Sequence, residues 1–195
     1  MVLTLVLSMA LMQSQDKLSP IVCPMTAEAV AVPFLNIDFG GTRYEMCCGG
    51  CPDGFKKDPA TALKSEKLKG KTVGIFLFDP VSNARVDPKT AKGGSSDYKG
   101  KRYFFATAEE KTTFDAEPKK FAAKTPKKEV LYCPVAGHAI KSYAAAGGYM
   151  DIDGTRYYTC CTSCLAKLKA DNTLAAKAPA DQVKAPITID VPKEK

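Results

Sequence analysis

Two stretches, "GTRYEMCCGGC" at residues 41–51 and "GTRYYTCCTSC" at residues 154–164, are nearly the same sequence. Each begins with a glycine, continues into an Arg-Tyr pair and ends in three cysteines within five positions, two of them adjacent. A third stretch, "GKRYFFATAEE" at residues 100–110, has the same glycine, arginine and aromatic residues but no cysteine. Because the three stretches align without gaps, they mark an internal repeat with three copies.

The local pattern predicts the same small structure in each copy. The pairs Gly40-Gly41, Lys99-Gly100 and Asp153-Gly154 lie between alternating apolar residues, and such pairs supply the positive φ of a two-residue hairpin turn. The Arg-Tyr-aromatic segment predicts the second strand, and the residues after the cysteine positions predict a short helix. We therefore predict an α+β fold of tandem modules, each a β-hairpin followed by a short helix.

The cysteines occur in complete sets. A module of this size buries too little core to be secure alone, so it needs a metal, a disulfide or a docked neighbour. All eight cysteines lie in the first and third copies, four in each. The two sets are Cys23, Cys47, Cys48 and Cys51, and Cys133, Cys160, Cys161 and Cys164. The matching positions of the middle copy are Asp79, Ala106, Thr107 and Glu110. Sets of four that are present or absent together predict two metal sites, with all eight cysteines as candidate ligands.

The spacing within a set suits metal binding. Cys47 and Cys51 are one helical turn apart and share a face at the predicted start of a helix, where the helix dipole lowers thiol pKa values. Cys23 precedes Pro24 and closes the site from the other side. Cys48 points about 100° around the helix from Cys47, so ligation, a free thiol and exchange with its neighbour stay open. Ligands made only of sulfur select zinc or copper(I), and we expect two ions per chain.

Other readings of the cysteines stay open. An even cysteine count is typical of a disulfide framework in an exported protein, for example with a Cys23–Cys51 bridge. A thiol–disulfide redox protein is a second alternative, although we expect neither the Cys-x-x-Cys motif of the thioredoxin-like pattern nor a βαβ context. A third alternative is a scaffold whose metals hold a protein-binding surface. His138, the only histidine, is either a ligand of the second site or a solvated loop residue. No nucleophile–base pair or phosphate loop is evident, so we expect no enzymatic activity.

Composition and termini indicate where the protein works. Residues 1–15 begin with an apolar run of signal-peptide length, although the basic n-region is missing. The alternative is a buried N-terminal helix, and we favour export to the periplasm or the extracellular space. The net charge is +7 and comes mostly from scattered lysines, which does not favour nucleic-acid binding and leaves a weak attraction to anionic partners. No apolar run reaches the roughly 18 residues of a membrane span. The Pro- and Lys-rich residues 176–195 predict a flexible tail.

The middle copy carries a resemblance to a known family. Its segment "YKGKRYFFATAEEKTTFDAEPKKFA", residues 98–122, resembles a YHS domain, a short module linked to heavy-metal handling. Ala106 and Glu110 replace the two cysteines of that family's Cys-x-x-x-Cys pair, and Ser82 occupies the place of its earlier cysteine. We therefore expect the middle copy to be a metal-free packing module.

The outer copies resemble the related TRASH-type modules. The family's distant cysteine and Cys-x-x-x-Cys pair are present as Cys23, Cys47 and Cys51, and as Cys133, Cys160 and Cys164. The resemblance implies treble-clef-like zinc-binding modules and a role in metal sensing, trafficking or resistance, with soft metal ions and another envelope protein as partners. It divides the chain into a TRASH-like module at 16–66, a degenerate YHS-like module at 70–125 and a second TRASH-like module at 127–175.

Overall fold

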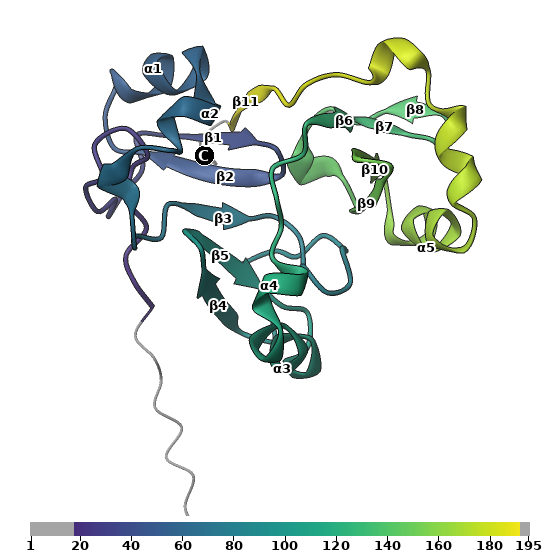
Figure 1. Ribbon diagram of the computed structural model, residues 1–195, viewed down its shortest axis with the longest axis horizontal. Helices are drawn as coiled ribbons and strands as arrows, with labels where there is room; N and C mark the ends of the chain where they lie inside the picture. The colour runs from purple at the N-terminus through teal and green to yellow at the C-terminus, as the bar shows by residue number, and fades with distance from the viewer. Residues whose placement is uncertain (1–17, 192–195) are drawn as a thin grey trace, which may run out of the picture.

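Three β-hairpins, each followed by a short helix, organise the chain (Figure 1). The computed structural model describes residues 18–191, and the predicted signal peptide at 1–15 lies outside the described residues. The hairpin strands are β1 (Leu35–Phe39) and β2 (Thr42–Met46), β4 (Ser95–Tyr98) and β5 (Lys101–Phe104), and β9 (Gly148–Ile152) and β10 (Thr155–Thr159). The helices that follow them are α1 (Cys51–Lys57), α3 (Ala108–Ala116) and α5 (Thr162–Ala170). The predicted hairpin–helix unit and the mixed α+β class are confirmed.

The remaining elements are short and connect these units. The strands are β3 (Gly74–Phe76), β6 (Lys128–Val130), β7 (Tyr132–Cys133), β8 (His138–Ala139) and β11 (Thr188–Val191). The helical turns are α2 (Pro59–Ala62), η1 (Glu66–Leu68), α4 (Pro118–Phe121), η2 (Tyr143–Ala145), η3 (Asn172–Lys177) and η4 (Ala180–Gln182).

The three hairpin turns have the backbone that their sequences predict. In each, both central residues have positive φ: 56° and 78° at Gly40-Gly41, 47° and 79° at Lys99-Gly100, and 47° and 77° at Asp153-Gly154. Two consecutive positive φ values are the mark of a type I′ turn, whose twist matches that of the flanking strands. Glycine at the second position of every pair takes this conformation without the steric cost of a side chain.

One ion pair is repeated across all three hairpins. An arginine in the second strand lies directly opposite an aspartate in the first strand, and its Nε donates to one carboxylate oxygen while its Nη2 donates to the other. The Nε distances are 2.9 Å for Arg43 to Asp38, 2.8 Å for Arg102 to Asp97 and 2.8 Å for Arg156 to Asp151. Bidentate Arg–carboxylate pairs fix geometry as well as energy, so each hairpin has the same register pinned at the same position.

The sheets join different copies of the repeat. Strands of the first two copies, together with β11 from the C-terminal segment, form one six-stranded sheet in the order β11-β1-β2-β3-β5-β4. In this sheet β3 pairs antiparallel to β2 and parallel to β5. The third copy forms a three-stranded sheet, β6-β10-β9, and β7 pairs with β8. Figure 1 shows the hairpin of the first copy at the left, that of the middle copy below it and the third copy at the right.

Two hydrophobic cores lie under these sheets. The core of the first copy is built around Phe55 of α1, whose ring centroid is 5.1 Å from that of Tyr44 on β2. The middle and third copies share the second core, in which Phe76 and Phe78 of the middle copy contact Tyr149 of the third. Small modules cannot bury enough surface alone, and here neighbouring copies complete each other. The domain boundaries at 16–66, 70–125 and 127–175 stay predictions.

The C-terminal segment differs from the predicted flexible tail at 176–195. Its strand β11 pairs antiparallel with β1 over four residue pairs, from Asn36–Val191 to Phe39–Thr188. Lys56 of α1 also donates to Asp190 at 2.6 Å. The tail therefore returns to the first copy and covers the edge of its hairpin, which would otherwise present unpaired backbone groups. The proline-rich composition that predicted flexibility does not exclude an edge strand, since the four paired residues contain no proline.

Candidate metal centres

The first candidate centre joins three sulfur atoms from two remote segments. Cys23 follows Ile21 and Val22, two residues that each form an isolated β-bridge with another segment. Cys47 follows the last residue of β2, and Cys51 is the first residue of α1. The Sγ atoms of these three cysteines all lie within 4.8 Å of one another. Cys23 and Cys51 are buried, at 0% and 5% exposure, while Cys47 is partly exposed. The structure thus brings Cys23 to the other two sulfur atoms, which is where a ligand that closes the site from the other side must lie.

The second candidate centre repeats this arrangement. Cys133 ends β7, Cys160 follows β10, and Cys164 lies in the first turn of α5. Their Sγ atoms also lie within 4.8 Å of one another. The two clusters are the groups of three or more potential ligands in residues 18–191 that lie close enough to hold one ion. All eight cysteines are free thiols in the structure.

The spacing of the sulfur atoms matches a tetrahedral ion. With a Zn–S distance of about 2.3 Å, two sulfur ligands at tetrahedral positions are about 3.8 Å apart. The Sγ atoms of Cys47 and Cys51 are 3.7 Å apart, and so are those of Cys160 and Cys164. The two sulfur atoms of each pair therefore lie at the separation that two ligands of one zinc ion have.

The distant cysteine of each set sits in a turn that stabilises negative charge. Ala27 N donates to the carbonyl of Cys23, and Gly137 N to that of Cys133, both at 2.8 Å. The turn aims backbone N–H groups of the second and third following residues at the sulfur. Burial alone raises the pKa of Cys23 and of Cys133. The backbone N–H of Cys47 or of Cys160, together with the N–H groups of the turn, lowers it by more, so the net shift of each pKa is downward. A thiolate is the form that binds metal.

The middle copy has the same turn with a carboxylate in place of the thiol. Asn83 N donates to the carbonyl of Asp79 at 2.8 Å, and Asp79 Oδ1 accepts from Val81 N at 2.8 Å and Ser82 N at 3.2 Å. Asp79 Oδ2 accepts from Ala106 N at 3.1 Å. Asp79 therefore occupies the place that Cys23 and Cys133 have in the outer copies. Ser82, which the YHS resemblance places at that family's earlier cysteine, contributes a backbone donor to this turn. Asp79 and Glu110 are two carboxyl groups of the middle copy, too few for a cluster of this kind.

The pKa of the last cysteine of each set is shifted upward, opposite to that of the distant cysteine. Burial, followed by hydrogen bonds with the neighbouring thiols, raises the pKa of Cys51 and that of Cys164. Three thiols that share one small volume cannot all ionise without a cation, because like charges repel. A bound metal ion reverses this effect and deprotonates its thiol ligands. Within each cluster the distant cysteine therefore ionises more readily than the last one, and a cation favours the thiolate form of all three ligands.

The remaining cysteines lie beside the clusters and differ from each other. Cys48 is exposed, and its Sγ is 2.8 Å from that of Cys51. Cys161 is the N-cap of α5, where its sulfur accepts from Cys164 N at 3.4 Å and contacts Ser163 Oγ at 3.1 Å. The Ser163 hydroxyl, followed by the Cys164 N–H, lowers the pKa of Cys161 to about 6. Neither sulfur belongs to the sets that lie mutually within 4.8 Å.

The expectation that the chain lacks a Cys-x-x-Cys motif is wrong. Cys48 and Cys51 are separated by two residues, and so are Cys161 and Cys164, which is the Cys-x-x-Cys spacing of redox motifs. The hydrogen bond of Cys51, followed by backbone N–H groups, lowers the pKa of Cys48. Each pair thus combines an outer thiol of lowered pKa with an inner thiol of raised pKa.

His138 lies outside the second cluster. It pairs through its backbone with Cys133 across β7 and β8, but its side chain is exposed and its Nδ1 contacts the carbonyl of Ala139 at 3.1 Å. It is not among the ligand atoms that lie close to the three cysteines. The solvated alternative for His138 is the one that the structure favours.

The chain was compared with protein families, curated proteins and solved structures. No protein-family model, no curated protein and no solved structure matches the chain. Among residues 18–191, no helix has both the length and the apolar character that crossing a membrane requires.

Proposed function

We propose that the chain is an exported, non-enzymatic protein that holds two soft metal ions, zinc or copper(I), one in each cysteine cluster. The observation that carries the proposal is the meeting of three sulfur atoms within 4.8 Å of one another, twice in one chain. Sulfur-only sites favour zinc and copper(I) over calcium or magnesium, which require oxygen ligands. The resemblance of the repeat to YHS and TRASH modules supports a role in heavy-metal trafficking or resistance.

The fourth cysteine supports transfer of the ion rather than permanent storage. A closed structural zinc site uses four ligands, whereas each cluster here offers three and keeps a further thiol outside. An exposed thiol next to a ligand can take over a coordination position as the ion leaves. In the first centre Cys48 is exposed and adjacent to Cys51, and we propose that an acceptor protein of the envelope approaches from that side.

Metal content and thiol state together test this function. The protein is purified without chelator and without oxygen, its metals are measured per chain, and its free thiols are counted. The expected result is one ion for each of the two clusters, with all eight cysteines reduced. Protein that remains metal-free after incubation with zinc or copper(I), although its thiols are reduced, would refute the proposal.

A second candidate function is thiol–disulfide exchange, and the Cys48–Cys51 distance favours it. The 2.8 Å separation of the two Sγ atoms is closer than two ligands of one tetrahedral ion, and the Cys-x-x-Cys spacing is that of redox proteins. In such a step Cys48 and Cys51 form a disulfide and pass two electrons and two protons to a disulfide partner, which becomes two thiols. Oxidised glutathione is the probe. A Cys48–Cys51 disulfide found by peptide mass spectrometry in metal-loaded protein would favour this candidate over metal transfer.

A further inference from the structure

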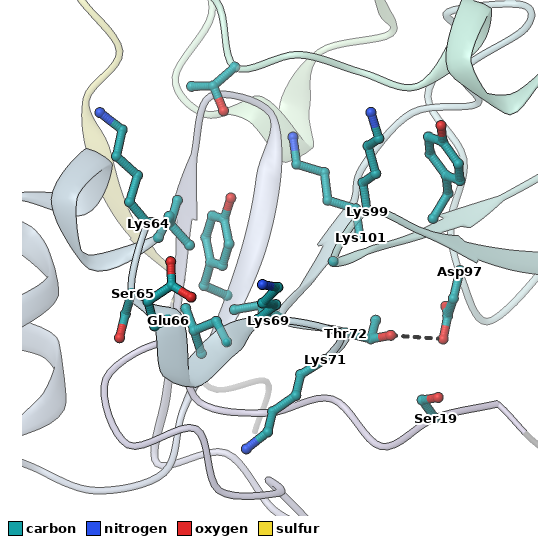
Figure 2. A pocket seen from close by; sticks show the side chains of 18 residues that line it. Ser19, Lys64, Ser65, Glu66, Lys69, Lys71, Thr72, Asp97, Lys99 and Lys101 are labelled. Atoms are coloured by element: carbon teal, nitrogen blue, oxygen red, sulfur yellow. Dashed lines mark hydrogen bonds between the residues drawn. The ribbon is translucent and has the colours of Figure 1, made fainter.

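A pocket lined by lysines lies where the first and middle copies of the repeat meet. Its volume is about 680 Å³, and most of its lining comes from residues 63–73 and from residues 97–101 at the turn between β4 and β5. Figure 2 shows Lys69 between the segment of Lys64 and Glu66 and the turn that carries Lys99 and Lys101. The pocket contains no cysteine, so it is separate from both metal centres.

Positive charge in this pocket exceeds negative charge. Five lysines line it, namely Lys64, Lys69, Lys71, Lys99 and Lys101, against Glu66 and Asp97. Asp97 is already engaged, because Arg102 binds both of its carboxylate oxygens at 2.8 Å and the Thr72 hydroxyl donates to it at 3.0 Å. Among residues 18–191, no ion pair within 4.0 Å involves Lys64, Lys69 or Lys99.

Backbone hydrogen bonds join the two segments that carry these lysines. Val73 N and Gly74 N both donate to the carbonyl of Gly100, at 2.8 and 3.2 Å, and Gly74 pairs with Lys101 in the parallel register of β3 and β5. The segment that carries Lys69 and the turn that carries Lys99 are therefore fixed against each other. Like charges that line one pocket raise the free energy of the empty protein, and a bound anion lowers it.

Two of the lysines are held in place at the edges of the pocket. Lys71 Nζ donates to the carbonyl of Ala27 at 2.9 Å. Lys101 Nζ donates to the carbonyl of Ala123 at 3.0 Å and lies 5.9 Å from the ring centroid of Phe76. Burial, followed by the charge of Arg156, lowers the pKa of Lys101 to about 8, because a buried site disfavours the charged form of the amine.

We propose that this pocket binds a soluble anion that carries two or more phosphate groups. The charged donors of the lining are lysines, and lysine binds phosphate as a point charge. The hydroxyls of Ser19, Ser65 and Tyr98 add hydrogen-bond donors for phosphate oxygens. The volume lies within the range of about 300–1,000 Å³ that is typical of small-molecule sites, which is far larger than a single phosphate needs.

Calorimetric titration with inorganic tripolyphosphate tests the proposal, with orthophosphate as the comparison ligand. The variant Lys69→Gln/Lys99→Gln removes two charges from the pocket. The matched control Lys119→Gln/Lys127→Gln removes two charges from exposed lysines outside it. We expect one tripolyphosphate per chain. Because the pocket variant removes charged hydrogen-bond donors, we expect its affinity to be weaker by about tenfold or more. The control is expected to change the affinity less than about twofold.

Several outcomes would overturn the proposal. They are no binding of tripolyphosphate, equal weakening in both variants, or orthophosphate that binds as tightly as tripolyphosphate. Vesicles of phosphatidylcholine with phosphatidylglycerol form a separate arm, and binding to them without binding to tripolyphosphate would assign the charge to a membrane surface instead. Lys64→Gln/Lys99→Gln is a second pocket variant, and it must weaken binding as the first does. Titration of metal-free protein keeps the result independent of the cysteine clusters.

Discussion

Replacement of Asp79 by alanine tests the claim that the turn before each hairpin is built around one buried anionic or acidic group. Asp79 is fully buried at 0% exposure, and its carboxylate accepts three backbone N–H bonds, from Val81, Ser82 and Ala106, at 2.8, 3.2 and 3.1 Å. Asp79→Ala leaves all three donors without a partner. At about 1 kcal/mol for each lost hydrogen bond, the free energy of unfolding falls by roughly 3 kcal/mol.

Urea unfolding of metal-free protein, followed by circular dichroism, measures this loss. We expect a lower midpoint with an unchanged slope, since the surface exposed on unfolding stays the same. In a thermal scan the same loss corresponds to about 6–12 °C for a chain of this size. The control is Asp87→Ala, which removes an exposed carboxylate that accepts one backbone N–H bond, from Lys89 at 2.9 Å. A loss for Asp79→Ala no larger than that for Asp87→Ala would refute the reasoning.

Three further predictions follow from the repeat and from its cores. The triple substitution Asp79→Cys/Ala106→Cys/Glu110→Cys places thiols at the positions that match the cysteine clusters, and we expect one additional ion per chain by elemental analysis; an unchanged metal content would contradict the equivalence of the three copies. Burial raises the pKa of Glu129, so the folded state binds this proton more tightly than the unfolded state. Relative to Glu129→Gln, the wild type should therefore lose stability as the pH rises above the ordinary value of 4.5, by up to about 1.4 kcal/mol per pH unit; a difference in urea midpoint that is independent of pH would argue against it. Phe55→Ala empties the core under α1, where Phe55 is 0% exposed, and we expect a loss of about 3–5 kcal/mol with weaker metal binding at the first cluster and unchanged binding at the second.

Local features of the fold could be predicted from the sequence because they depend on neighbouring residues. The X-Gly pairs favour a turn with positive φ whatever surrounds them. In the outer copies, the three closely spaced cysteines mark the start of the helix or the residues just before it. The aspartate–arginine pair was readable as well, since Asp and Arg are five residues apart in every copy. It was missed because the alignment began at the glycine, after the aspartate.

The pairing between copies could not be predicted in the same way. The strand β3 joins the hairpins of two copies, and β11 returns from the end of the chain to pair with β1. Both pairings are made by backbone groups of short segments, and the sequence of a three- or four-residue strand does not specify which strand it pairs with. The shared core of the middle and third copies follows from this arrangement, with Phe78 packed at 5.3 Å from Tyr149 between ring centroids.

The cysteine sets were predicted as groups of four, and the structure separates them into three plus one. The turn before each hairpin positions the first cysteine of the set, and the helix after the hairpin positions the fourth. The sequence indicates both that turn and that helix. The difference between Cys48 and Cys161 depends on the start of the helix. Cys161 caps α5, while Pro52 at the start of α1 and the N-cap Gly50 leave Cys48 without that role. The adjacent cysteines of the two sets are therefore not equivalent.

Metal stoichiometry of single cysteine variants tests the central claim most directly. Native mass spectrometry after anaerobic loading with zinc, and separately with copper(I), counts the ions held by wild type, Cys23→Ser, Cys133→Ser and the control Cys48→Ser. The account predicts one ion for each of the two clusters in the wild type, the loss of one ion in Cys23→Ser and in Cys133→Ser, and no loss in Cys48→Ser. Full occupancy in Cys23→Ser, or the same loss in Cys48→Ser as in Cys23→Ser, would contradict it.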